Sequence, residues 1–235
     1  MLNTDHIIQS KALIYKPYSQ SRGDGFSGKL LIAAEADNSE KRYIIKAGMA
    51  HVAACEFMFY MLAGKLGLRV ARVRLIKPAK RREFKYPACA VDFIPNAVKL
   101  RYDEYIKTPE CEILSHLSYI LGDRDHLDFL NDETGVVYKI DHSDCFGIED
   151  TAETWINPKN ITPSYVFYQM KKPIPLIGHY ADNELLWDMF DNISHLSTDD
   201  FNDAFALINE FCGKPFEEHF RHYIGDLIRQ CRALG

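Results

Sequence analysis

The sequence predicts an α+β protein with a small β-rich N-terminal lobe carrying one helix and a mainly helical C-terminal lobe. Short apolar runs separated by Gly, Asn and Asp fill the chain up to residue 94, and helical periodicity dominates after residue 183. Pro95 and Asn96 interrupt the chain, so we expect the lobes to span residues 1–95 and 96–235. A bilobal plan leaves a cleft at the join, where ligands tend to bind.

The N-terminal lobe begins with three predicted antiparallel strands. They are the apolar runs at 12–16, 30–34 and 42–46. The first connection contains Gly23, Gly25 and Gly28, whose missing side chains would let backbone amides approach phosphate groups. Glycine-rich hairpin loops usually only turn the chain, so this signal is weak by itself.

A helix is predicted at 50–66, where apolar residues recur at helical spacing and Gly67 follows as a C-cap. Glu56 is the only acidic residue between Glu40 and Glu83 and stands in an otherwise apolar helix. A lone charge in such a place is often paired. Lys46, at the end of the preceding strand, is the candidate partner; two unrelated surface charges are the alternative.

The rest of the chain continues this pattern. Two more strands are predicted at 69–76 and 86–94, and a short one at 136–140. Residues 148–182 contain four prolines and are predicted to form a long loop with one short helix. Helices are predicted at 109–121, 183–193, 198–212 and 215–234, with Ser197 or Thr198 as an N-cap and Pro215 in a first turn.

Three carboxylates indicate a chemistry. Asp123 and Asp128 lie in a polar turn after the predicted helix 109–121. Asp141 directly follows the short apolar run at 136–140. Phosphoryl transfer needs one carboxylate near the attacking hydroxyl and hard oxygen ligands for Mg²⁺. An acidic surface turn is the common alternative, but the lysine and the acidic residue of the N-terminal lobe precede it in the order that a kinase requires.

Bulk properties exclude several other classes. The net charge of −5 and pI near 6.0 disfavour nucleic acid as a direct partner. No apolar run approaches the ~20 residues of a membrane span, and the N-terminus lacks a signal-peptide core, so we expect no membrane contact. The six cysteines lack zinc-ligand spacing and are expected to be free thiols in a reducing cytoplasm.

Four motifs in order carry a resemblance to HipA-like kinases and the phosphatidylinositol 3- and 4-kinases. The strand Tyr43-Ile44-Ile45-Lys46 is the first, and residues 55–70 resemble the family's "NE…LA..LGL.V" segment. Residues 120–130 (ILGDRDHLDFL) resemble the catalytic loop "IGN.DRH..N.L", and residues 140–147 (IDHSDCFG) resemble the metal-binding turn "IDHG..FG". The resemblance covers roughly residues 12–150 and implies a protein-kinase-like fold.

The resemblance implies a role for each motif residue. Lys46 would bind the phosphates of ATP and Glu56 would hold it, while Asp123 would orient or deprotonate the acceptor hydroxyl. Mg²⁺ would be held by Asp128 and Asp141. The adenine would meet a hinge, through backbone amides and carbonyls, at Asp92, Phe93 and Ile94.

Two departures from the family pattern leave alternatives open. Asp128 replaces the usual Asn, which leaves room for a catalytically inactive, nucleotide-binding regulatory module. The additional Asp125 allows a register in which it is the base, but only Asp123 has an oxygen ligand five residues later. A metallohydrolase built on His126, Asp128, Asp141 and His142 ranks lower, because it leaves the Lys46–Glu56 pair unexplained.

The acceptor implied by the HipA-like branch is a Ser or Thr of a protein, and an antitoxin-like regulator would be a further partner. A small-molecule or inositol-lipid kinase would use the same machinery with a different substrate surface. A lipid kinase should carry a basic segment after the metal-binding turn. Residues 143–165 instead contain Lys159 as their one basic residue, beside Asp144, Glu149, Asp150 and Glu153.

Overall fold

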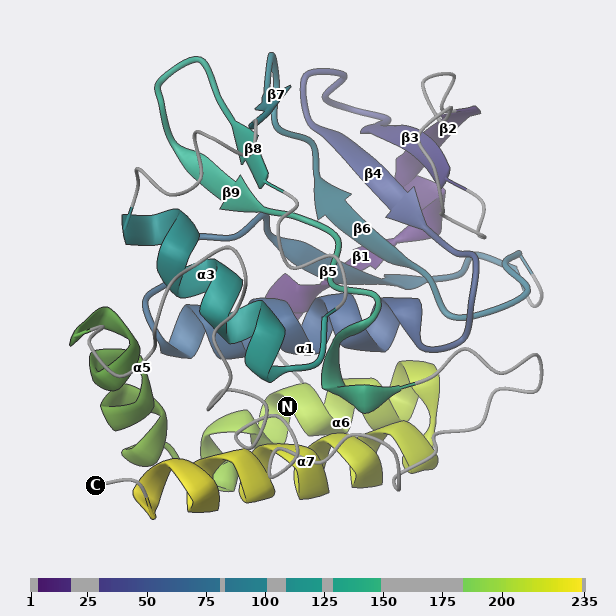
Figure 1. Ribbon diagram of the computed structural model, residues 1–235. Helices are drawn as coiled ribbons and strands as arrows, with labels where there is room; N and C mark the ends of the chain where they lie inside the picture. Colours follow the sequence, from purple (N-terminus) through teal and green to yellow (C-terminus); the bar gives the residue numbers. More distant parts are fainter. Residues whose placement is uncertain are drawn as a thin grey trace.

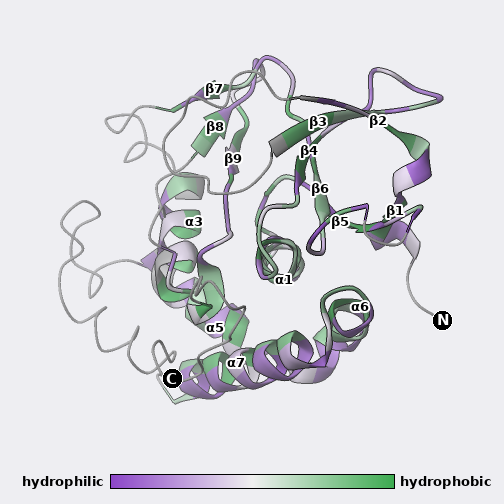
Figure 2. Cartoon of the chain, turned by 90° about the vertical axis from the view of Figure 1, so that its right-hand side faces the viewer, coloured by the Kyte–Doolittle hydropathy of each residue, from purple (hydrophilic) through white to green (hydrophobic). Residues whose placement is uncertain are grey.

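The computed structural model describes residues 4–17, 30–80, 83–100, 109–123, 129–148 and 184–233. Helix α1 (Val52–Lys65) lies between a six-stranded sheet and the helices α6 (Asn202–Cys212) and α7 (Lys214–Arg232), as Figure 1 shows from the side and Figure 2 along the axis of α1. Helix α1 contacts β5 and β6 on the sheet side and α6 on the other. The chain is therefore a mixed α+β protein, as predicted.

The large sheet has the strand order β1-β5-β6-β4-β3-β2. Its strands are β1 (Ile7–Gln9), β2 (Leu13–Pro17), β3 (Leu30–Glu35), β4 (Arg42–Lys46), β5 (Val73–Lys77) and β6 (Cys89–Asp92). Strands β2, β3 and β4 pair antiparallel, which confirms the predicted three-stranded start. Strand β1 runs parallel to β5 and was not predicted, because three residues carry too little periodicity to be recognised.

A second, three-stranded sheet has the order β7-β8-β9, and its last strand leads into the turn that contains Asp141. Its strands are β7 (Val98–Lys99), β8 (Phe129–Asn131) and β9 (Val137–Lys139). The sequence predicted only the third of these. Val70 forms a bridge with Lys139 of this sheet, so the strand predicted from residue 69 joins the large sheet only at Val73. The strand predicted at 86–94 is shorter as well, spanning Cys89–Asp92.

The predicted helices are present with small shifts. Helix α3 spans Pro109–Ile120 and α5 spans Glu184–Ser194. Ser197 is the N-cap of a short 3-10 helix, Thr198–Phe201, that leads into α6, and Pro215 lies in the first turn of α7. Further 3-10 turns occur at Thr4–His6, Ser10–Ala12 and Cys145–Gly147. The loop predicted at 148–182 lies outside the described residues, except for Ile148.

One apolar cluster contains residues from both the N-terminal and the C-terminal parts of the chain. It contains Phe57 of α1, Val91 of β6, Leu117 of α3, Phe205 of α6 and Leu227 of α7. Helix α1 is apolar on nearly every side, because it packs on the sheet with one face and on helices with the other. The core thus runs across residue 95, and the division into two lobes stays a prediction. Within the described ranges, no helix is long and apolar enough to cross a membrane.

Candidate active site

The candidate site begins with Lys46, the last residue of β4. Its backbone lies opposite Cys89 of β6, and its side chain is buried. The Nζ donates a hydrogen bond to Oε1 of Glu56 and another, 3.0 Å long, to Oδ1 of Asp141. The predicted ion pair is therefore present, and a second carboxylate from far along the chain completes it. Burial lowers the pKa of Lys46, but the two carboxylates more than offset that effect and raise it above its ordinary value.

Glu56 connects three parts of the chain. Its side chain is 2% exposed, which rules out the alternative of a surface charge. The oxygen that accepts from Lys46 also accepts the backbone N–H of His142 at 2.9 Å. Helix α1 thus ties the end of β4 to the turn after β9. A carboxylate buried in an apolar helix is tolerated because its partners replace the water that it has lost.

Asp141 is the most exposed of these three residues. Its backbone is left-handed, with φ of 60°, and Ser143 donates to Oδ1 from 3.1 Å. The Lys46 ammonium lowers the pKa of the Asp141 carboxyl below its ordinary value, against the effect of burial. Its side chain is 32% exposed, so a metal ion in solvent can reach this ionised carboxylate. A hard, charged oxygen beside a lysine fits Mg²⁺ bound together with phosphate.

Local backbone geometry places Asp123 directly after α3. Gly122 has φ of 84°, and the amide of Asp123 donates to the carbonyl of Ser118 at 3.0 Å, as in a Schellman helix end. The amide of Phe146 donates to the carbonyl of Leu121, so this helix end is joined to the turn that follows Asp141. The side chain of Asp123 is 1% exposed.

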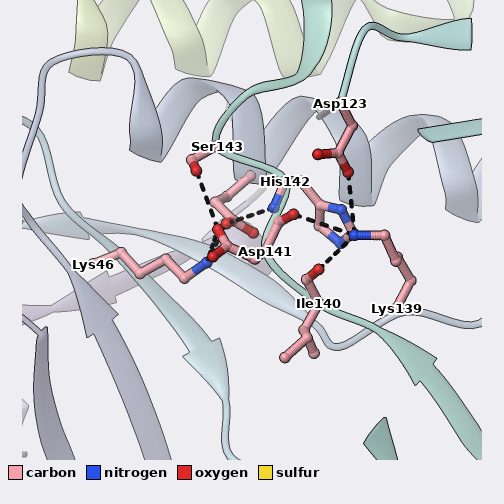
Figure 3. Close-up of polar contacts among 8 residues, drawn as sticks. Lys46, Asp123, Lys139, Ile140, Asp141, His142 and Ser143 are labelled. Carbon is pink, nitrogen blue, oxygen red and sulfur yellow. Dashed lines mark hydrogen bonds and ion pairs between the residues drawn. The ribbon is translucent and has the colours of Figure 1, made fainter. Parts of the chain in front are cut away.

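Lys139 is the site residue that the sequence analysis missed. It is fully buried on β9, and its Nζ lies 3.1 Å from Oδ2 of Asp123. Figure 3 shows Lys46 and Lys139 approaching the turn at 140–143 from opposite sides. A signal was available, because Lys139 is a lone charge in the short apolar strand before Asp141, as Glu56 is in α1.

His142 and Cys145 lie behind the turn, close to Asp123. One potential ligand atom of each residue lies within 4.8 Å of the other two, and all three residues are buried. The Lys139 ammonium already neutralises Asp123, which opposes a cation there. Burial raises the pKa of the Cys145 thiol well above its ordinary value, which argues against a thiolate nucleophile.

The lower-ranked alternative, a metallohydrolase, gains no support from this geometry. The His142 ring stacks on Phe59, with ring centroids 3.6 Å apart, whereas the Asp141 carboxylate contacts Lys46. Two of its four proposed ligands thus contact different partners. Burial first, then the charges of Lys139 and Lys46, holds the pKa of His142 well below its ordinary value, so the ring is neutral.

The predicted adenine hinge begins at Asp92, the last residue of β6. The amide of Asp92 donates to the carbonyl of Arg72 and the amide of Phe93 to that of Arg42, each at 2.9 Å. Those two amides are already hydrogen-bonded within the protein, so the predicted contact with adenine would use carbonyl groups and the amide of Ile94. The Asp92 carboxylate pairs with Arg74 at 2.7 Å. Ile94 packs against the apolar cluster that contains Phe57, where an adenine ring would find an apolar neighbour.

Other predicted residues lie outside the described part of the chain. They are Gly23, Gly25 and Gly28 of the glycine-rich loop, and Asp125, His126 and Asp128 of the polar turn. The structure therefore brings together Lys46, Glu56 and Asp141, and places Asp123 behind them beside Lys139. The roles assigned to all of these residues remain predictions.

Comparison with known proteins adds evidence on the fold. No protein-family model matches the chain, and no curated protein matches it. The crystal structure of the proinflammatory kinase CtkA of Helicobacter pylori is similar, with a TM-score of 0.52 and 12% identity over 94% of this chain and 98% of that chain. The FAT and kinase domain of CtTel1 gives a TM-score of 0.39 at 12% identity, over 88% of this chain and 21% of that one.

The likeness to CtkA shows that this chain has a kinase-like fold. At 12% identity it shows the fold alone, so substrate and activity must be argued from the site itself. The narrower resemblance to HipA-like kinases stays a prediction.

Proposed function

We propose that this protein is an ATP- and Mg²⁺-dependent kinase that transfers the γ-phosphoryl group of ATP to a hydroxyl, with a Ser or Thr of a protein as the acceptor. The observation that carries the proposal is the Lys46 ammonium, buried and held by both Glu56 and Asp141. A strand lysine fixed by a helix carboxylate, beside a second carboxylate that solvent can reach, matches the parts that phosphoryl transfer requires. The kinase-like fold supports it.

Each residue then has a stated task. Lys46 neutralises charge on the nucleotide phosphates, and Glu56 keeps the ammonium in place. Asp141, together with Asp128, would hold Mg²⁺, which when bound offsets the negative charge of the phosphates. The residues beyond 95 would supply the catalytic loop, and those before it most of the nucleotide contacts.

Asp123 is the proposed base, and its burial matters. A base must contact the acceptor hydroxyl, yet the Asp123 side chain is 1% exposed and paired with Lys139. This observation favours a second candidate function, a nucleotide-binding module without turnover. Both candidates require the same nucleotide site, so one experiment can separate them.

The test is label transfer from γ-labelled ATP with Mg²⁺, with and without generic protein substrates. Wild type is compared with Lys46→Ala and Asp141→Ala, and with Lys41→Ala as the matched control, because Lys41 is 61% exposed. Transfer that is lost in the two site variants and kept in the control supports the kinase. An ATP-induced rise in melting temperature without transfer supports the binding module. If the protein shows neither ATP binding nor label transfer, both candidate functions are refuted.

A further inference from the structure

We propose that Lys139 is a positioning residue, which holds Asp123 in register with the turn that carries Asp141. The inference rests on the proposed kinase function. It concerns how the base and the metal-binding carboxylate, which belong to separate segments of the chain, keep a constant relative position.

The contacts of the Lys139 ammonium carry the inference. It lies 3.1 Å from Oδ2 of Asp123 and donates to the carbonyls of Ile140 and Asp141, at 2.7 and 3.3 Å. An ammonium has three N–H donors, and two of them are used by these carbonyls, while the contact with Asp123 is an ion pair. Figure 3 shows the three contacts converging on one nitrogen. Because the pair is buried, water cannot take over any of them.

Both ends of this connection are attached to regular structure. Lys139 pairs with Phe129 of β8 and bridges Val70, so its backbone is fixed from two sides. Asp123 is fixed by the end of α3, because its backbone N–H donates a hydrogen bond to the carbonyl of Ser118. A side chain held between a strand and a helix end can set a geometry more closely than one between two loops.

This arrangement has a consequence for the reaction. The carbonyls that Lys139 contacts belong to Asp141 and to the residue before it, so one nitrogen atom links the Asp123 carboxylate to the backbone that carries Asp141. Removing the ammonium would take away the contact that connects the Asp123 carboxylate to this turn, while Lys46 would still contact Asp141. We therefore expect the loss to appear in the chemical step rather than in nucleotide binding.

The experiment measures kcat and the KM for ATP in wild type, Lys139→Met and Lys139→Gln. Lys214→Met is the control, because Lys214 is an exposed lysine that is also paired with a carboxylate, that of Glu218. For Lys139→Met we expect kcat to fall by about 100-fold, the usual effect of a small misplacement of a catalytic group, with KM near wild type. Gln keeps a donor for Asp123 and should recover part of kcat.

Each outcome decides the matter. An unchanged kcat in Lys139→Met, or a KM that rises as kcat falls, overturns the positioning role while the kinase proposal stands. If both variants lose cooperative thermal unfolding, Lys139 is structural and the role is overturned too. If wild type shows no turnover with any acceptor, the kinase proposal fails first and takes this inference with it.

Discussion

Replacing Glu56 by alanine should destabilise the protein strongly. Its side chain is 2% exposed and that of Lys46 is 9% exposed, so neither charge can be hydrated if its partner is lost. Removing one member of a buried pair costs about 3–5 kcal/mol. Asp141 remains 3.0 Å from the Lys46 Nζ, which places the expected cost at the lower end of that range.

A second loss adds to the first. The His142 amide donates to the same Glu56 oxygen, and a buried donor left without an acceptor costs about 1 kcal/mol or more. We expect Glu56→Ala to lower the free energy of unfolding by about 4 kcal/mol in total, or the melting temperature by roughly 10 °C for a chain of this size.

Urea unfolding followed by circular dichroism measures this change. The double variant Lys46→Met with Glu56→Leu should lose less than Glu56→Ala, because no unpaired ammonium remains in the interior. The matched control is Glu218→Ala, which removes a carboxylate that is 62% exposed and should leave the midpoint near wild type. A cost below about 1 kcal/mol for Glu56→Ala, or a double variant that is merely additive, would refute the reasoning.

Two further predictions concern stability alone. Gly64→Ala should stabilise the protein by about 0.5–1 kcal/mol, because this glycine is helical with open space around it. Gly67→Ala should destabilise it by about 1 kcal/mol, because the φ of Gly67 is +68°. Thermal melts in which the two variants shift the melting temperature in the same direction would contradict this. His142 is held neutral in the folded state, because its pKa lies well below the ordinary 6.5. Below pH 6.5 the unfolded protein therefore binds a proton on His142 that the folded protein does not bind. The free energy of unfolding then falls by up to about 1.4 kcal/mol per pH unit. His142→Phe should flatten that slope between pH 6.5 and 5, and an unchanged slope in urea titrations would show that other groups cause it.

The sequence was sufficient for most of the regular structure. Strands β2 to β4 and helix α1 were predicted within about two residues, because their apolar patterns and glycine boundaries are local signals. Strands β1, β7 and β8 were missed because each is only two or three residues long, which is too short for a periodic pattern. The predicted start of β5 was too early, since Val70 bridges the second sheet instead.

For the site, the sequence by itself indicated the lysine and the carboxylates on which the proposed function depends, but not Lys139. Glu56 stood out as a lone carboxylate in an apolar helix, and Lys46 as a lysine at the end of a strand before it. Composition and local pattern contain that information, because a charge in an apolar segment must find a partner.

Only the tertiary structure decided which partners meet. Asp141 pairs with Lys46 across 95 residues, Lys139 pairs with Asp123, and the His142 ring stacks on Phe59. The physical reason is that each contact forms between elements that are distant in sequence and brought together by the packing of α1 between sheet and helices. Pattern within a segment reports how that segment folds, but the distance between two segments is set by the core that they share.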